Sequence, residues 1–214
     1  MRTRVITGSA AELHAVPLPT VDQPTANDEA ELWVMQPTAP ALVMGSSQKP
    51  EQFDTKRLAD EGIELAGRRS GGGAVFIEPA STVWIDLLAP RSSPWWSADL
   101  AENFVLVGEV WRRALSSLGI ETDMCSEAPT RTDAATLACW AGVGWGELTI
   151  DGAKVLGLSQ RRTRWGSRVQ AMAVLDDSST RAADYFVSGE RPTIPHTTLD
   201  IDRPALEMAV LANF

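Results

Sequence analysis

The most informative segment of this chain is Arg68-Arg69-Ser70-Gly71-Gly72-Gly73-Ala74-Val75. Three consecutive glycines are costly to order and give no side chain to a core, so they suit a place where the backbone must approach another group closely. Successive N–H groups of such a loop can point at an anion or a carbonyl oxygen. The glycines alone favour a flexible connection between strands, whereas the two arginines favour an anionic or acyl ligand. A nucleotide P-loop is disfavoured, because no Gly-Lys-Ser/Thr follows at the required spacing.

Length and composition predict one domain that is not embedded in a membrane. A chain of 214 residues with 44% hydrophobic content can bury one sizeable core. We therefore expect a single domain over residues 1–214, with a Pro-rich and weakly patterned segment at 1–30. No run approaches the ~20 apolar residues of a membrane span. The start, Met1–Ser9, lacks the apolar stretch of a signal peptide.

The cysteines, the histidines and the net charge argue against a disulfide scaffold, a metal-binding protein and a nucleic-acid-binding protein. Two cysteines, Cys125 and Cys139, fit a reduced cytoplasmic protein better than a disulfide scaffold. The histidines, His14 and His196, lie near no cysteine pair, so we predict no metal site. The net charge of −9 argues against general affinity for nucleic acid.

The cations are unevenly placed along the chain. One group is Arg68 and Arg69, and a second is Arg161, Arg162, Arg164 and Arg168. If the two groups converge in space, an acidic protein carries one local positive region. An ordinary solvated face is the alternative.

Hydrophobic patterning predicts an α+β domain, with a mostly antiparallel sheet packed against a few helices. The clearest helix begins at a Ser97 cap and stops at Gly119, with an apolar stripe at three-or-four spacing. A long irregular segment of about twenty residues starts at Thr122 and contains Cys139, and such loops are usually functional or mobile. Strands are expected at 31–35, 41–44, 63–66, 75–77, 82–88 and 169–175, and further helices from Pro50 to Gly62, at 179–186 and at 203–213.

A hairpin is predicted at Asp151-Gly152, because this dipeptide stands between two strand-like runs. The expected register places Lys154 on the polar face with Thr149 and Glu147. A lysine beside a tight turn is ordinarily solvated. The other face is apolar, and its pairs are Ile150 with Ala153 and Leu148 with Val155.

These motifs, in this order, resemble the lipoate–protein ligase and octanoyltransferase family of the biotin/lipoyl ligase superfamily. The glycine loop is followed by Asp151-Gly152-Ala153-Lys154-Val155-Leu156-Gly157-Leu158-Ser159-Gln160-Arg161-Arg162. Leu32-Trp33 and Val43-Met44-Gly45-Ser46-Ser47-Gln48 are similar to the family's opening strands and its Gly-x-x-Gln turn. The resemblance covers residues 31–190 and implies a catalytic domain with the biotin/lipoate ligase-like fold.

The resemblance also implies a site. Lys154 matches the family's lysine, which with the glycine loop surrounds the carboxyl end of a lipoyl or octanoyl chain; a cation there can stabilise charge on the acyl oxygen. The apolar tail needs a tunnel, for which Trp33, Val43, Val75 and Trp84 are candidates. The substrate-binding residues implied are Arg68, Arg69, Ser70, Gly71, Gly72, Gly73, Ala74, Gly157, Ser159 and Gln160.

Family members use two chemistries. Ligases activate lipoate with ATP and magnesium through an acyl-adenylate, whereas transferases pass an acyl group through a cysteine and need no ATP. Cys139-Trp140, upstream of Lys154, resembles the cysteine-bearing transferases. Three ligase features are replaced here: an Asn-Asp pair by Gly146-Glu147, an aromatic-His-Asp pattern by Phe76-Ile77-Glu78, and a later His by Val169-Gln170-Ala171. The chain also ends without the C-terminal domain that many ligases have.

We therefore expect an octanoyl or lipoyl transferase in which Cys139 is the nucleophile and Lys154 favours its thiolate. Cys125 is a weaker nucleophile candidate, and Cys139 could instead be a small buried thiol. The alternatives are an ATP- and magnesium-dependent lipoate–protein ligase and a non-catalytic acyl- or carrier-binding module.

The expected partners are lipoyl carrier domains of the glycine cleavage H-protein or dehydrogenase E2 type, and an acyl carrier protein as donor. These carriers are generally acidic, so the arginine groups could form a docking face or bind a phosphate. Charge reversal at Arg164 or Arg168 is then expected to slow reaction with a carrier, chiefly at low salt.

Overall fold

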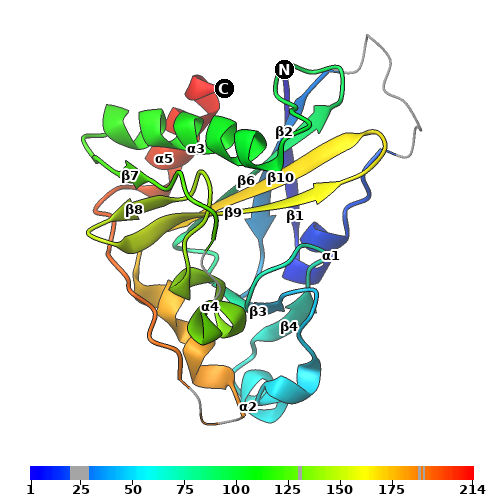
Figure 1. Ribbon diagram of the computed structural model, residues 1–214. Coiled ribbons are helices and arrows are strands. Elements are labelled where there is room, and N and C mark those ends of the chain that lie inside the picture. Colours follow the sequence, from blue (N-terminus) through cyan, green and yellow to red (C-terminus); the bar gives the residue numbers. More distant parts are fainter. Residues whose placement is uncertain (20–28, 130–131, 188, 190) are drawn as a thin grey trace.

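The protein contains two β-sheets, one large and one small (Figure 1). The computed structural model describes residues 1–19, 29–129, 132–187, 189 and 191–214. The large sheet has seven strands, and all of its pairs are antiparallel except the first. The α+β prediction is confirmed. The strands of the large sheet lie in the order β1 (Arg2–Gly8), β2 (Glu31–Pro37), β6 (Thr82–Pro90), β10 (Gly166–Val174), β9 (Ala153–Arg162), β8 (Leu148–Ile150) and β7 (Asp123–Met124).

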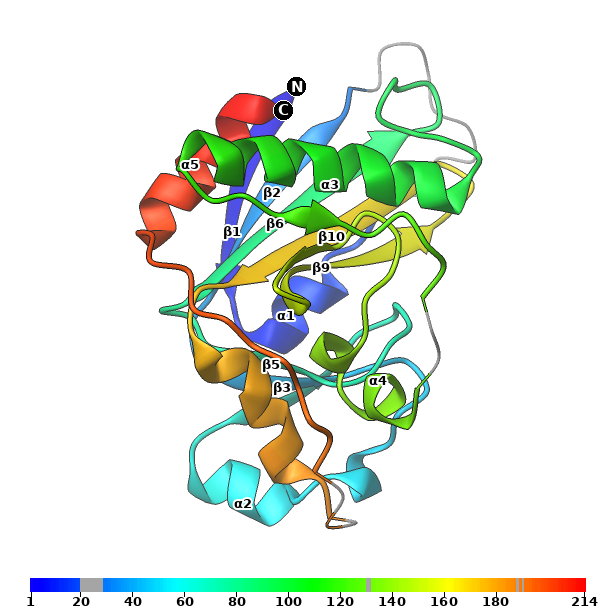
Figure 2. The same ribbon diagram turned by 60° about the vertical axis from the view of Figure 1, so that its left-hand side comes forward.

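Two helices cover one face of the large sheet, as Figure 2 shows. They are α3 (Leu100–Ser117) and α5 (Arg203–Asn213), and α3 buries the predicted stripe around Trp111. The cap of α3 is Asp99 and not Ser97, because the Asp99 carboxylate accepts the backbone N–H of Ala101. The Ser97 hydroxyl instead accepts the backbone N–H of Asp99.

The other face of the large sheet packs against α1 (Ala10–Ala15) and a three-stranded sheet. That small sheet has the order β4 (Glu64–Gly67), β3 (Ala41–Met44) and β5 (Val75–Ile77). It is supported from outside by α2 (Thr55–Asp60) and by the 3-10 helix η3 (Asp177–Tyr185). The space between the two sheets is where the glycine loop and the predicted hairpin meet.

Several local predictions were wrong. No helix or strand was predicted in the weakly patterned segment 1–30, yet it contains β1 and α1; residues 20–28 lie outside the described part. The helix expected from Pro50 is broken into the 3-10 turn η1 (Pro50–Gln52) and α2, and that expected at 179–186 is the 3-10 helix η3. The irregular segment after Thr122 holds β7, α4 (Asp133–Leu137) and the 3-10 turn η2 (Cys139–Ala141).

The hairpin β8–β9 forms at Asp151-Gly152 with one departure from the expected register. Ile150 pairs with Ala153 and Thr149 with Lys154, as predicted. Leu148 pairs with Leu156 and not with Val155, because an irregularity between Leu148 and Thr149 shifts the register. A bulge of this kind changes the direction of nearby side chains, and Glu147 directly precedes Leu148, where β8 begins.

Among the described helices, none is long and apolar enough to cross a membrane.

Candidate active site

The glycine loop and the cysteine segment are joined backbone to backbone. Ala74 forms a bridge with Ala138, and its carbonyl accepts the N–H of Cys139 at 2.9 Å. A Cβ on Gly73 would lie 2.6 Å from the backbone of Leu137, so only glycine fits there. Gly72 has φ +99°, and a Cβ on it would lie 3.6 Å from the Cys139 sulfur. Gly73 therefore permits a close approach to the backbone just before Cys139, and Gly72 lies beside Arg68 and the Cys139 sulfur.

Lys154 lies beside that cysteine and is almost completely buried, with 5% of its surface exposed. Its Nζ donates to the Cys139 carbonyl oxygen at 2.8 Å and lies 4.0 Å from the Cys139 sulfur. The ammonium also sits 5.6 Å from the centre of the Trp140 ring. The ordinary expectation of a solvated lysine is thus wrong at this position.

Glu147 is the ionic partner of Lys154, and it was absent from the predicted site residues. One carboxylate oxygen accepts from Lys154 Nζ at 3.0 Å and from the Gly144 N–H at 2.8 Å. The other accepts from the Leu158 N–H at 2.9 Å. Burial lowers the pKa of Lys154, but the nearby Cys139 and Glu147 outweigh burial and raise it overall. The signal that could have identified Glu147 was its shared face with Lys154 in the hairpin.

Arg68 supports the loop from inside. It is buried, and its guanidinium donates to the carbonyls of Gly73 at 2.7 Å, Gly71 at 3.0 Å and Val43 at 3.4 Å. Burial lowers the pKa of Arg68, and the neighbouring Cys139 opposes that shift. The arginine therefore fixes the loop conformation while placing a positive charge near the thiol.

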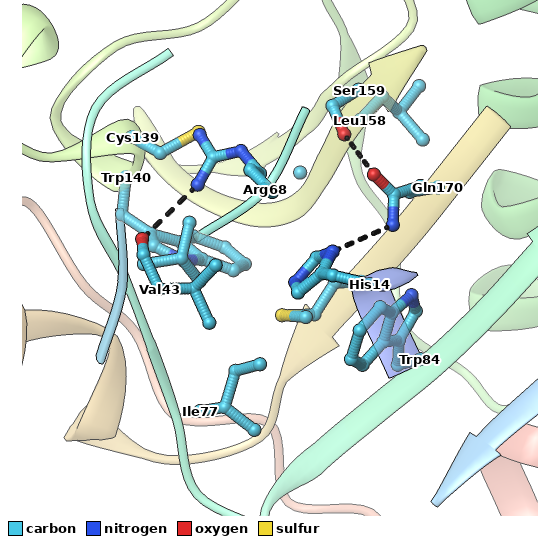
Figure 3. A pocket seen from close by; sticks show the side chains of 13 residues that line it. His14, Val43, Arg68, Ile77, Trp84, Cys139, Trp140, Leu158, Ser159 and Gln170 are labelled. Carbon is cyan, nitrogen blue, oxygen red and sulfur yellow. Dashed lines mark hydrogen bonds between the residues drawn. The ribbon is translucent and has the colours of Figure 1, made fainter. Parts of the chain in front are cut away.

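Cys139 lies where two hollows meet. The first is an apolar cavity of about 50 Å³ between the sheets (Figure 3). The second is a cleft of about 290 Å³ that Lys154 and Glu147 also line. Cys139, Leu158 and Ser159 line both of them. An acyl chain in the cavity and a reacting group in the cleft could both reach the sulfur.

The predicted tunnel residues are mostly in place. Val43, Val75 and Trp84 line the apolar cavity. Trp33 does not line it: the side chain is buried in the core, with its ring 5.3 Å from the Arg168 guanidinium. His14, Ile77, Trp140, Gln170 and Met172 complete the lining with residues that sequence analysis did not select.

The implied substrate-binding residues occupy four kinds of position: the cavity lining, the cleft lining, the backbone beside the cysteine segment, and places that line neither hollow. Arg68, Gly157 and Ser159 line the cavity, whereas Gly71, Gly72, Ser159 and Gln160 line the cleft. Gly73 and Ala74 act through the backbone of the cysteine segment. Ser70 is buried with its hydroxyl 3.3 Å from Gln170, and Arg69 is exposed.

A polar network closes one side of the apolar cavity. Gln170 donates to His14 Nδ1 at 3.2 Å, and its carbonyl oxygen accepts from Ser159 at 3.3 Å (Figure 3). Burial, with Arg68 and Arg168 nearby, lowers the pKa of His14 to about 3. His14 is therefore neutral at physiological pH.

The arginines do not form one surface cluster. Arg168 is buried and bonded to Asp86 at 2.6 Å, so the prediction that it belongs to a docking face was wrong. Arg162 donates to the carbonyls of Ala98 and Asp99 ahead of α3. Arg69 and Arg164 are exposed, and Arg161 is partly so, which leaves these three as surface cations from the predicted set.

The remaining candidates contribute less. The Cys125 thiol contacts the Glu127 carbonyl at 3.6 Å and lines neither hollow. Within the described residues, no three His, Cys, Asp or Glu side chains are grouped so as to hold a metal ion.

Comparison with known proteins gives consistent matches. The family model described as "Lipoyl protein ligase A/B catalytic domain" matches residues 19–202. The octanoyltransferase LipM of Carboxydothermus hydrogenoformans is 30% identical over 126 residues, which are 58% of this chain and 45% of that protein. The chain thus matches less than half the length of this relative.

Two solved structures share the fold at low identity. A lipoate-protein ligase A bound with ATP has a TM-score of 0.69 and 16% identity, covering 100% of this chain and 83% of that one. A structure of a bi-partite lipoate protein ligase and its E2 lipoyl domain from Thermoplasma acidophilum has a TM-score of 0.67 and 16% identity, covering 88% and 71%.

Proposed function

Because the chain belongs to the lipoyl protein ligase A/B catalytic domain family, we propose that it is an acyltransferase that carries an octanoyl or lipoyl group on Cys139. The acceptor is a lysine of a lipoyl carrier domain. The observation that supports this proposal most strongly is the Cys139 sulfur, 4.0 Å from Lys154 Nζ at the junction of an apolar cavity and an open cleft.

The reaction proceeds in two displacements. The Cys139 thiolate attacks the donor thioester, forms a new C–S bond and expels the donor thiolate, which takes a proton. The acceptor amine then attacks the carbonyl carbon, a C–N bond forms, the C–S bond breaks and the amine loses its proton. Lys154 supplies a buried positive charge beside the sulfur, where it stabilises the thiolate and charge that develops on the acyl oxygen.

The two hollows suit the two parts of the substrate. The acyl tail occupies the apolar cavity lined by Val43, Val75 and Trp84. The donor arm and, later, the acceptor lysine approach through the cleft beside Gly72 and Gln160. No ATP or metal is needed on this route, because the donor thioester is already activated.

The partners proposed here are those of the family, and charge bears on how they would dock. Acyl carrier and lipoyl domains are generally acidic, whereas this chain has a net charge of −9. Arg69, Arg161 and Arg164 provide local positive charge for docking these carriers. The expected acceptors are lipoyl domains of the H-protein or E2 type.

The test is to trap the acyl-enzyme. Incubation with octanoyl-acyl carrier protein should add one octanoyl group, which peptide mass spectrometry locates on Cys139. Cys139→Ala should lose transfer to a lipoyl domain, and Cys125→Ala is the matched control that should retain it. Full transfer by Cys139→Ala would overturn the proposal, and ATP-dependent lipoate attachment by that variant would establish a ligase instead.

A further inference from the structure

The site holds a lysine of its own next to the sulfur that carries the acyl group. Lys154 Nζ is 4.0 Å from Cys139 Sγ, and the acyl carbonyl carbon would be one bond beyond that sulfur. The reaction proposed above moves this acyl group to a lysine amine. A neutral Lys154 would therefore compete with the acceptor lysine as the nucleophile.

Charge on Lys154 is what prevents this competition, because an ammonium has no lone pair with which to attack. The charged groups that face Lys154 are Cys139, Glu147 and Arg68. Before acylation, Glu147 and the sulfur of Cys139 both oppose the cost of burying the ammonium. Once the thioester forms, Cys139 is neutral, and the carboxylate of Glu147 is the anionic partner that remains.

We infer that Glu147 is a positioning residue that keeps Lys154 protonated in the acyl-enzyme and so protects it from acylating itself. This inference rests on the proposed function. Its geometric basis is the 3.0 Å contact between Lys154 Nζ and a carboxylate that is itself 6% exposed. The Gly144 and Leu158 N–H groups hold the same carboxylate from two sides, so it cannot turn away from the lysine.

The side reaction is chemically complete without any added reagent. Lys154 Nζ, once deprotonated, attacks the acyl carbonyl carbon and forms a C–N bond. The C–S bond to Cys139 breaks, and the thiolate takes up the proton released by the amine. The product is an amide on Lys154, which unlike a thioester does not return its acyl group.

Glu147→Gln is the direct test, with octanoyl-N-acetylcysteamine as a small acyl donor. Hydroxylamine cleaves thioesters and leaves amides intact, so it separates the two adducts before peptide mass spectrometry. Wild type should carry a hydroxylamine-labile octanoyl group on Cys139. The variant should accumulate a resistant octanoyl group on Lys154. Below the lysine pKa, the neutral fraction of the amine rises about tenfold for each unit by which the pKa falls or the pH rises. The resistant adduct should therefore form faster at higher pH.

Three further variants make the test specific. Glu147→Asp keeps a carboxylate and should restore the labile adduct. Glu147→Gln combined with Lys154→Arg should form no resistant adduct, because the guanidinium stays charged. Glu109→Gln, which removes a carboxylate paired with Arg112 on α3, is the matched control and should behave as wild type.

The outcomes separate the two proposals. If wild type forms no adduct on Cys139, the acyltransferase proposal fails and the role of Glu147 falls with it. If wild type is acylated and folded Glu147→Gln carries only the labile adduct at every pH, the role of Glu147 alone is overturned. Should Glu147→Gln not fold by circular dichroism, a pH series on wild type decides: a resistant Lys154 adduct that appears as pH rises supports the inference, and its absence contradicts it.

Discussion

Lys154–Glu147 and Arg168–Asp86 are both buried ion pairs, but they differ in what else they touch. Lys154 is 5% exposed and Arg168 3%. The first pair borders the cleft, and its lysine also donates a hydrogen bond to the Cys139 carbonyl oxygen. The second borders neither hollow, and its other hydrogen bonds include one to Leu13 in α1 and one from Trp84, which lies on the same strand as Asp86.

The difference shows that a buried ion pair can serve either the structure or the reaction. Arg168 on β10 bonds to Asp86 on β6 and to the carbonyl of Leu13 in α1, so it links three elements. Asp86 also accepts from the Trp84 indole at 2.6 Å. Burial raises the pKa of Asp86, and Arg168 opposes that shift. This pair is structural, whereas we propose that the Lys154 pair serves the reaction.

Removing the Lys154 pair should have the largest effect, and it should fall on activity. Lys154→Met combined with Glu147→Gln removes both charges of this pair and leaves neither partner unpaired, so the free energy of unfolding should change little. Transfer of octanoate to a lipoyl domain should fall by about 10²–10³-fold, as when a single group that stabilises the transition state is removed. Transfer assays and urea titration of the same preparation measure both. Retained transfer would place the chemistry elsewhere.

Breaking the Arg168 pair should have the opposite signature. Asp86→Ala leaves a buried guanidinium without its carboxylate, which costs about 3–5 kcal/mol of stability. The melting temperature should fall by roughly 2–4 °C for each kcal/mol. Well below that temperature, the folded fraction should keep most of its transfer rate. A stable but inactive Asp86→Ala variant would contradict the distinction between the two pairs.

His14, which is hydrogen-bonded to Gln170 and lies near Arg168, should also make the stability of the protein sensitive to acid. The pKa of His14 is about 3 in the folded protein and 6.5 in its ordinary state. Between these values the unfolded chain binds the proton and the folded protein does not, so stability is lost as pH falls from about 6.5 toward 3. The groups that disfavour the imidazolium are the facing Arg68 and Arg168, in addition to burial.

His14→Gln should remove this sensitivity. The slope of unfolding free energy against pH in that range should become shallower by up to about 1.4 kcal/mol per pH unit. Denaturant titrations at several pH values measure it, with His196→Gln as the matched histidine control. Parallel curves for His14→Gln and wild type would show that His14 is protonated in the folded state.

The two pairs also show how far sequence reasoning reaches. Lys154 was selected because it matches the lysine of the family that the sequence resembles, and the turn signal correctly predicted that Thr149 pairs with it. Arg168 was misplaced on the surface because its partner Asp86 lies on a strand far away in the sequence, and no local pattern encodes that contact. Strand β1 was missed for a related reason: it is an edge strand whose residues are mostly exposed, so no apolar alternation indicates it.

The site was predicted in part for the same physical reasons. Motif order selected the glycine loop, Cys139 and Lys154, and the structure brings these residues close together. The cavity needed long-range information, because Ile77, Gln170 and His14 come from β5, β10 and α1. His14 also lies outside the residues 19–202 that match the family model.

The smallest expected effect concerns Arg161, which lies directly opposite Arg168 in the β9–β10 register yet is partly exposed. Burial and the neighbouring Arg69 and Arg168 lower the pKa of Arg161, which marks a region of like charge. Arg161→Glu should slow octanoyl transfer from an acidic carrier protein a few-fold at low salt. It should leave the reaction of octanoyl-N-acetylcysteamine unchanged, because that donor has no protein surface to dock.

Salt separates docking from chemistry for this variant. The Debye length is about 30 Å at 0.01 M ionic strength and about 8 Å at 0.15 M, so the effect of Arg161→Glu should shrink as salt is added. Arg113→Glu on α3 is an exposed control away from the cleft and should show no such dependence. An Arg161→Glu defect that persists equally at high salt and with the small donor would mean that Arg161 acts through the folded structure, as Arg168 does, and not through the carrier.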